Sequence, residues 1–83
     1  MKIIKYSTKA IKQIKKIKDK KLKKLITIKI DELKNYPDTN LIVSTYKTTD
    51  MLKFRVKNWR VFFTSKRENL IVEEVKKRNE RTY

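Results

Sequence analysis

Arg55 and Arg60 are the residues of this chain whose types and spacing point most directly to chemistry. They flank Lys57-Asn58, and a two-residue turn at that dipeptide would place the two arginines directly opposite each other in a β-hairpin. Like charges in opposed positions destabilise a hairpin, by about a few tenths of a kcal/mol. Because a guanidinium can bind a phosphate through two parallel hydrogen bonds, the pair predicts an anion-binding site.

The same register divides the hairpin into two faces, because directly opposed residues share a face. One face is apolar throughout and consists of Leu52, Phe54, Val56, Trp59, Val61 and Phe63. The other face carries Lys53 and Phe62 beside the two arginines. We expect the apolar face, Trp59 included, to lie in the core and the opposite face to be free to bind.

The types of side chain on this second face match the requirements of RNA cleavage by its own 2′-hydroxyl, which needs proton transfers and stabilisation of charge at phosphorus. Arg55 and Arg60 are candidates for holding the phosphate. Neighbouring cations disfavour the protonated form of Lys53, which makes it a candidate acid or base. Tyr83 is the second candidate for proton transfer. Phe62 is a candidate for stacking on a nucleobase, a contact worth ~1–3 kcal/mol.

Each of these residues also has a simpler explanation. Arg55 and Arg60 fit ordinary exposed strand arginines that attract RNA or an acidic protein. Phe62 fits a residue covered by a C-terminal segment or a partner, and Tyr83 stands at the end of the chain, where order is often poor. Glu73 and Glu74, on the last expected strand, fit local charge balance rather than a catalytic carboxylate pair.

The composition excludes several classes of chemistry. The 83 residues suffice for one domain, and they include neither histidine nor cysteine. Disulfides, thiol nucleophiles, the usual zinc ligands and imidazole catalysis are therefore excluded, and we expect no metal and no small-molecule cofactor. The formal net charge of +15 predicts that the chain binds nucleic acid or an acidic partner.

The cations are unevenly distributed. Residues 1–30 hold twelve lysines and one acid, whereas all five arginines lie within residues 55–81. The lysines fit a solvated helix face, and the arginines are better suited to phosphate. Further candidates for contacts with RNA are Lys57, Lys76, Lys77 and Arg81.

The chain has no apolar run near the roughly 18 residues of a membrane span, and residues 1–6 lack the apolar stretch of a secretory signal. We expect a cytoplasmic protein with no membrane partner.

Apolar periodicity predicts one α+β domain over residues 1–83, with the order β-α-α-β-β-β-β. A short strand at 3–6 precedes a helix capped by Ser7 or Thr8, and a second helical period from Leu22 to Leu33 ends at a turn around Pro37. A helical hairpin and one long bent helix both fit this pattern. The expected strands that follow are 41–46, 52–56, 59–63 and 70–75.

These strands form a mainly antiparallel sheet, with the two helices packed on its apolar face. Because the chain has no glycine, we expect Asn and Asp to supply any left-handed turn residues.

The hairpin block KFRVKNWRVFF, residues 53–63, resembles a strand pair of the RelE/ParE superfamily of bacterial type II toxins. Residues 75–83 resemble that family's closing basic stretch and tyrosine, and the opening strand with its two helices fits as well. The resemblance therefore covers essentially the whole chain. It implies an α+β fold with a two-helix hairpin on one face of the sheet.

The resemblance also implies site residues. The family has two basic positions on the strand before the turn, which correspond to Lys53 and Arg55, and an arginine after the turn aromatic, which corresponds to Arg60. Its basic residue before the terminal tyrosine corresponds to Lys77 or Arg78, and the tyrosine itself corresponds to Tyr83.

RelE-like members cleave mRNA on the ribosome, whereas ParE-like members inhibit DNA gyrase without a nuclease centre. The basic cluster favours a ribosome-dependent mRNA endoribonuclease, and without histidine such an enzyme would depend on positioning by the ribosome. The alternatives are a gyrase inhibitor and a small basic RNA-binding protein. The implied partners are the ribosome, mRNA and a cognate antitoxin whose acidic segment covers the basic face or displaces the C-terminal segment.

Overall fold

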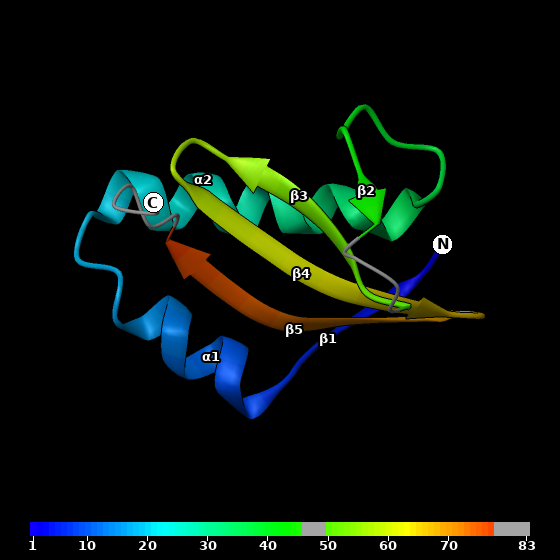
Figure 1. Cartoon of the computed structure of the whole chain (residues 1–83), viewed down its shortest axis with the longest axis horizontal. Coiled ribbons are helices and arrows are strands. Elements are labelled where there is room, and N and C mark those ends of the chain that lie inside the picture. The colour runs from blue at the N-terminus through cyan, green and yellow to red at the C-terminus, as the bar shows by residue number, and fades with distance from the viewer. Residues whose placement is uncertain (46–49, 78–83) are drawn as a thin grey trace.

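The computed structural model describes residues 1–45 and 50–77, which form five strands, two α-helices and a short 3₁₀ helix (Figure 1). In chain order these elements are β1 (Ile3–Tyr6), α1 (Thr8–Lys15), α2 (Lys20–Asp31), η1 (Glu32–Asn35), β2 (Ser44–Thr45), β3 (Leu52–Val56), β4 (Trp59–Lys66) and β5 (Asn69–Lys77). The predicted order β-α-α-β-β-β-β is confirmed.

The strands form one mixed sheet in the order β1-β5-β4-β3-β2. β1 pairs in parallel with β5, and the other three pairings are antiparallel, as expected of a mainly antiparallel sheet. Because the two helices connect β1 at one edge to β2 at the other, they cross one face of the sheet.

The two helices are separate because each has its own cap. The Ser7 hydroxyl accepts a hydrogen bond from the Ala10 N–H at 3.0 Å, as a helix N-cap does. Asp19 caps α2 in the same way, accepting from the N–H groups of Lys21 and Leu22 at 3.0 and 3.1 Å. The predicted Ser7 cap is confirmed, and of the two helical arrangements the helical hairpin is the one observed.

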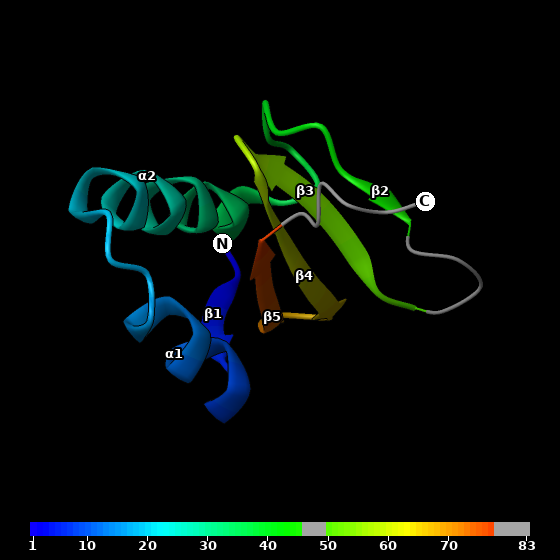
Figure 2. The same ribbon diagram turned by 60° about the vertical axis from the view of Figure 1, so that its left-hand side comes forward.

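The core lies between the helices and one face of the sheet, and Figure 2 shows both helices on the same side of the strands. The helices and η1 contribute Ala10, Ile17, Ile26, Ile30 and Leu33, and the strands contribute Phe54, Val56, Val61, Phe63, Leu70, Val72 and Val75. Trp59 is half-buried and packs against this cluster, as predicted. The side of the sheet away from α1 and α2 is called the outer face below.

The predicted strand at 41–46 is mostly wrong for the residues described. Pairing is confined to Ser44 and Thr45, and Tyr46 lies outside the described residues. The Thr39 hydroxyl instead accepts a hydrogen bond from the Leu41 N–H at 3.3 Å, a local bond that competes with strand pairing. Leu41 and Val43 still pack against the core from this irregular segment.

The expectation that Asn and Asp supply the left-handed turn residues is also wrong in the described segments. Lys57 and Arg67, each with φ of 54°, begin the two tight turns of the β3-β4 and β4-β5 hairpins. The register that buries the apolar face decides which residues fall at the turn. Lys57 and Arg67 therefore adopt the left-handed backbone conformation although both have long side chains, at a cost of about 1–2 kcal/mol each.

Replacing Arg67 with glycine should relieve this backbone strain and raise the free energy of unfolding by about 0.5–1 kcal/mol, whereas Arg67→Val should lower it by at least about 1 kcal/mol. Urea unfolding at constant m-value measures both changes. Lys66→Gly, one residue earlier in β4, is the control and should be destabilising. If Arg67→Gly and Lys66→Gly lower stability equally, Arg67 does not adopt the left-handed conformation.

Candidate anion-binding site

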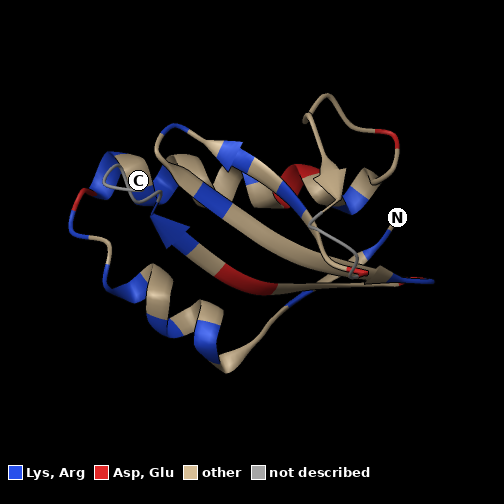
Figure 3. Ribbon diagram, viewed as in Figure 1, with Lys and Arg blue, Asp and Glu red and all other residues tan. Residues whose placement is uncertain are grey.

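Three cations lie directly opposite one another across the three neighbouring strands β3, β4 and β5. Arg55 is opposite Arg60, as predicted, and Arg60 is opposite Lys76 on its other side. Figure 3 shows basic residues on all three strands at the end of the sheet near the β3-β4 turn. Adjacent strands are about 4.8 Å apart, so the three side chains leave the sheet within a span of about 10 Å. These three residues are called the cation row.

Lys53, Phe62 and Glu74 form the next row along the outer face. Lys53 is half-buried and stands two residues from Arg55 on the same strand, so their side chains point to the same side of the sheet. The structure therefore brings together Lys53, Arg55 and Arg60, which the sequence predicts to share one site, and it places Lys76, a predicted RNA contact, beside them.

A β-bulge places Lys76 in the cation row. Phe62 is opposite Glu74 but Phe63 is opposite Val72, so Glu73 is an extra residue in β5. If the pairing after the β4-β5 turn continued without this shift, Val75 would face Arg60 and an apolar residue would lie on the outer face.

The prediction of a strand at 70–75 did not include the bulge, although the sequence contains a signal for it. The buried positions Leu70, Val72 and Val75 are spaced by two residues and then by three. A regular strand keeps a spacing of two, so the change indicates an inserted residue between Val72 and Val75.

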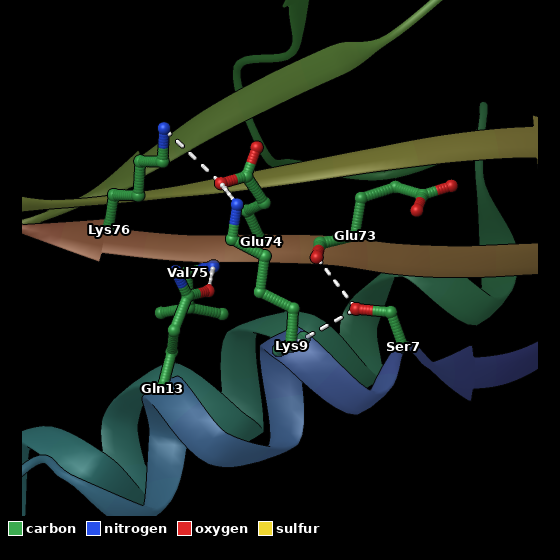
Figure 4. Close-up of polar contacts among 8 residues, drawn as sticks. Ser7, Lys9, Gln13, Glu73, Glu74, Val75 and Lys76 are labelled. Carbon is green, nitrogen blue, oxygen red and sulfur yellow. Dashed lines mark hydrogen bonds and ion pairs between the residues drawn. The ribbon is translucent and has the colours of Figure 1, made fainter.

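Helix α1 replaces β1 along the part of β5 that carries Lys76. β1 ends at Tyr6, opposite Val72. Beyond this point the Ser7 hydroxyl donates a hydrogen bond to the Glu73 carbonyl oxygen at 2.7 Å, and the Gln13 amide oxygen accepts one from the Val75 N–H at 2.6 Å (Figure 4). Ser7, the N-cap of α1, and Gln13 within α1 thus satisfy backbone groups that an edge strand would leave unpaired.

Glu74 forms ion pairs with two lysines that come from different elements. Its Oε1 atom lies 2.9 Å from Nζ of Lys9, on α1, and 3.2 Å from Nζ of Lys76 (Figure 4). The hydrogen bond from Lys9, assisted by Lys76, lowers the pKa of Glu74, and burial opposes this shift. Glu73 accepts a hydrogen bond from the Thr64 hydroxyl at 3.0 Å. These contacts agree with the interpretation of both glutamates as local charge balance.

The other predicted site residues do not all lie beside the cation row. Phe62 is only 5% exposed, so stacking of a base on its ring requires the ring to become accessible. Lys57 is exposed in the turn. Lys77 is exposed and opposite Trp59, which puts it on the side of the sheet away from the cation row. Arg78, Arg81 and Tyr83 lie outside the described residues.

A groove of about 610 Å³ lies along the edge of β3 that faces away from β4, between that strand, α2 and the segment before β2. β2 pairs with Leu52 and Lys53, so this pairing does not extend along β3 to Phe54. Cations and apolar side chains line the groove together, among them Leu25, Lys29, Leu41, Ile42, Arg55 and Arg60. The groove cannot be predicted from the sequence, because it depends on how α2 and an irregular segment meet the sheet edge.

Within residues 1–45 and 50–77, no three acidic side chains gather as metal ligands would. In the same part of the chain, no helix has both the length and the apolar character needed to cross a membrane.

The sequence matches the model of a protein family described as the ParE toxin of type II toxin–antitoxin system, parDE, over residues 4–81. A comparison with curated proteins finds no match.

Solved structures with a similar fold include toxin–antitoxin complexes. The RelE–RelB complex of Pyrococcus horikoshii OT3 has a TM-score of 0.78 at 16% identity, covering 95% of this chain and 97% of that one. The RelB–RelE antitoxin–toxin complex of Methanococcus jannaschii has a TM-score of 0.74 at 18% identity, covering 88% of each chain. YafQ of Escherichia coli BL21(DE3) has a TM-score of 0.59 at 17% identity, covering 93% of each chain.

The fold is a two-helix hairpin on a mainly antiparallel sheet with a basic outer face. It agrees with the family match, which covers nearly the whole length of the chain. The chain belongs to the ParE toxin family of type II toxin–antitoxin systems, within the RelE/ParE superfamily of toxins.

The lowered pKa of Glu74 predicts a pH-dependent contribution to stability. A carboxylate whose pKa is lowered in the folded state stabilises the fold above its unfolded pKa of about 4.3, and this stabilisation is lost as the pH falls toward the lowered value. Glu74→Gln should therefore flatten the fall in stability as the pH drops from about 5 through the unfolded pKa and below it. Urea unfolding at several pH values measures this slope. A slope equal to that of the unmodified protein would mean that Lys9 and Lys76 do not hold the carboxylate in solution.

Proposed function

We propose that this toxin is a ribosome-dependent endoribonuclease that cleaves mRNA. The observation that carries the proposal is the cation row with Lys53 beside it, on the side of the sheet away from the helices. Like charges opposite one another destabilise a sheet, and a bound phosphate would offset that repulsion.

In this mechanism Arg55 and Arg60 bind the scissile phosphate and stabilise the negative charge that develops on it. A base removes the proton of the 2′-hydroxyl, and the oxygen attacks the adjacent phosphorus. The bond from phosphorus to the 5′-oxygen breaks, leaving a 2′,3′-cyclic phosphate, and the leaving oxygen takes up a proton. Lys53 and Tyr83 are the two candidates for these proton transfers.

The ribosome would supply what this surface lacks. The chain has no histidine to transfer protons near neutral pH. Fixing the mRNA in a strained, in-line geometry can contribute a large part of the rate acceleration. We therefore expect weak cleavage of free RNA and efficient cleavage of translated mRNA.

Inhibition of DNA gyrase is the second candidate function. The family model that matches this chain is that of a ParE toxin, which favours this alternative. In that case the cation row would bind its partner electrostatically and would perform no chemistry.

Induction of the toxin, with mapping of mRNA 5′ ends and of DNA breaks in the same cells, distinguishes the two functions. We expect cuts in phase with codons, reduced by at least about 100-fold in Arg60→Ala and Lys53→Ala because phosphate binding and proton transfer would be lost. Lys12→Ala, which removes an exposed lysine of α1, should leave the cuts intact. DNA breaks that depend on gyrase, together with intact mRNA, would contradict the nuclease proposal.

We also propose that a cognate antitoxin inhibits the toxin by laying an acidic segment over the cation row and the groove beside β3. The groove combines apolar side chains with Lys29 and Arg55, which suits a segment that alternates apolar and acidic residues. The complexes of RelE with RelB support the existence of such a partner.

Charge reversal of Arg55 to Glu should weaken the complex with the antitoxin about 10-fold or more at low salt, mainly through the attraction lost at the interface. Lys12→Glu changes the net charge equally on an exposed position of α1 and is the control. Isothermal titration of the toxin with its antitoxin measures both. Equal weakening by the two variants would show a general charge effect and would place the acidic segment elsewhere.

A further inference from the structure

In the cation row, the ammonium group of Lys76 is repelled by neighbouring cations. Lys76 lies directly opposite Arg60, which is itself opposite Arg55. A lysine side chain is flexible, and repulsion from the neighbouring guanidinium favours conformations that extend into water. Some contact must therefore hold the ammonium group near the outer face.

Two contacts hold it there. Nζ of Lys76 lies 3.2 Å from Oε1 of Glu74 and 6.0 Å from the centre of the Phe62 ring. Phe62 and Glu74 are opposite each other in the row adjacent to the cation row. The ammonium group is thus held between a carboxylate and an aromatic ring, both of which attract a cation.

Glu74 is itself held by helix α1. Oε1 of Glu74 lies 2.9 Å from Nζ of Lys9, and the Glu74 side chain is only 21% exposed, compared with 63% for Lys9 and 54% for Lys76 (Figure 4). The hydrogen bond that Ser7 donates to the Glu73 carbonyl oxygen and the one that Gln13 accepts from the Val75 N–H hold α1 beside the bulge. The placement of the Lys76 ammonium therefore depends on contacts that begin at α1.

Stability alone does not account for this arrangement. Ion pairs with exposed partners contribute about 0–1 kcal/mol, and the backbone contacts of Ser7 and Gln13 already hold the helix. A carboxylate beside an anion-binding surface also weakens the attraction of that surface for nucleic acid. Glu74 therefore carries an electrostatic cost for binding that stability alone does not explain.

We propose that Glu74 is a positioning residue for the cation row, and that it holds the ammonium of Lys76 on the outer face, over the Phe62 ring, so that Lys76 and Arg60 bind the backbone of one RNA strand. The proposal rests on the proposed function for the identity of the ligand as RNA. It concerns binding, and it does not require cleavage.

Binding of a single-stranded 2′-O-methyl RNA oligonucleotide tests the proposal, because an RNA without free 2′-hydroxyls cannot be cleaved by their attack. Fluorescence anisotropy with the whole toxin gives the affinities at fixed salt. Lys76→Ala should weaken binding about 5- to 10-fold through loss of a charge-assisted contact. Glu74→Gln should weaken it about 3-fold, although the variant is more basic. The double variant should bind no more weakly than Lys76→Ala alone, because Glu74 acts through Lys76.

Glu73→Gln is the matched control, since it makes the same change in charge one residue away, at a side chain that contacts Thr64. It should bind RNA as tightly as the unmodified toxin or more tightly. Glu74→Asp keeps the charge but withdraws the carboxylate by one carbon, and it should also weaken binding. This variant decides the question if Glu74→Gln does not fold in urea-unfolding measurements.

Tighter binding by Glu74→Gln, equal to that of Glu73→Gln, would overturn the proposal, as would an unchanged affinity in Glu74→Asp or additive effects in the double variant. None of these outcomes bears on cleavage. Conversely, absence of mRNA cuts in induced cells would overturn the nuclease function and leave the relation between Glu74 and Lys76 standing.

Discussion

The register between β4 and β5 shifts by one residue at the bulge opposite Phe62 and Phe63, and the arrangement of the outer face depends on that shift. Beyond the bulge, Val75 points into the core and Lys76 points outward, opposite Arg60. Glu73 and Glu74 lie in the part of β5 where α1 packs against the strand. A strand without the bulge would place an apolar side chain beside the arginines.

The cation row shows how a small domain can carry a local electrostatic cost. Three like charges in opposed positions are unfavourable, but each stands on a strand whose other face is buried in the core. The apolar residues fix the register, with about 25 cal/mol gained for each Å² of apolar surface buried, and the cations must accept the positions that remain. Glu74 offsets part of the repulsion, because Lys9 and Lys76 both pair with it.

Local patterns predicted much of the fold. The apolar alternation on either side of Lys57-Asn58 predicted the register of the β3-β4 hairpin, and Ser7 and Pro37 marked the start of the first helix and the turn after the second. The strand expected at 41–46 is largely absent from the described residues, because β propensity in that segment competes with a local bond from Thr39 and with packing of Leu41 against the core. Asn and Asp were predicted at the left-handed turn positions, but Lys57 and Arg67 occupy them, because the strand register outweighs the conformational preference of any single residue.

The sequence by itself determined the Arg55–Arg60 pair and its proximity to Lys53, because all three lie within one hairpin whose alternation can be read along the chain. Only the tertiary structure decided that Lys76 joins them and that Lys77 does not. That choice depends on the bulge and on pairing between β4 and β5. Lys9 is far from Glu74 in sequence, and only the packing of α1 against β5 brings their side chains together. Contacts between distant segments form only when the buried apolar surfaces fix how the elements pack, and that information is not contained in any one segment.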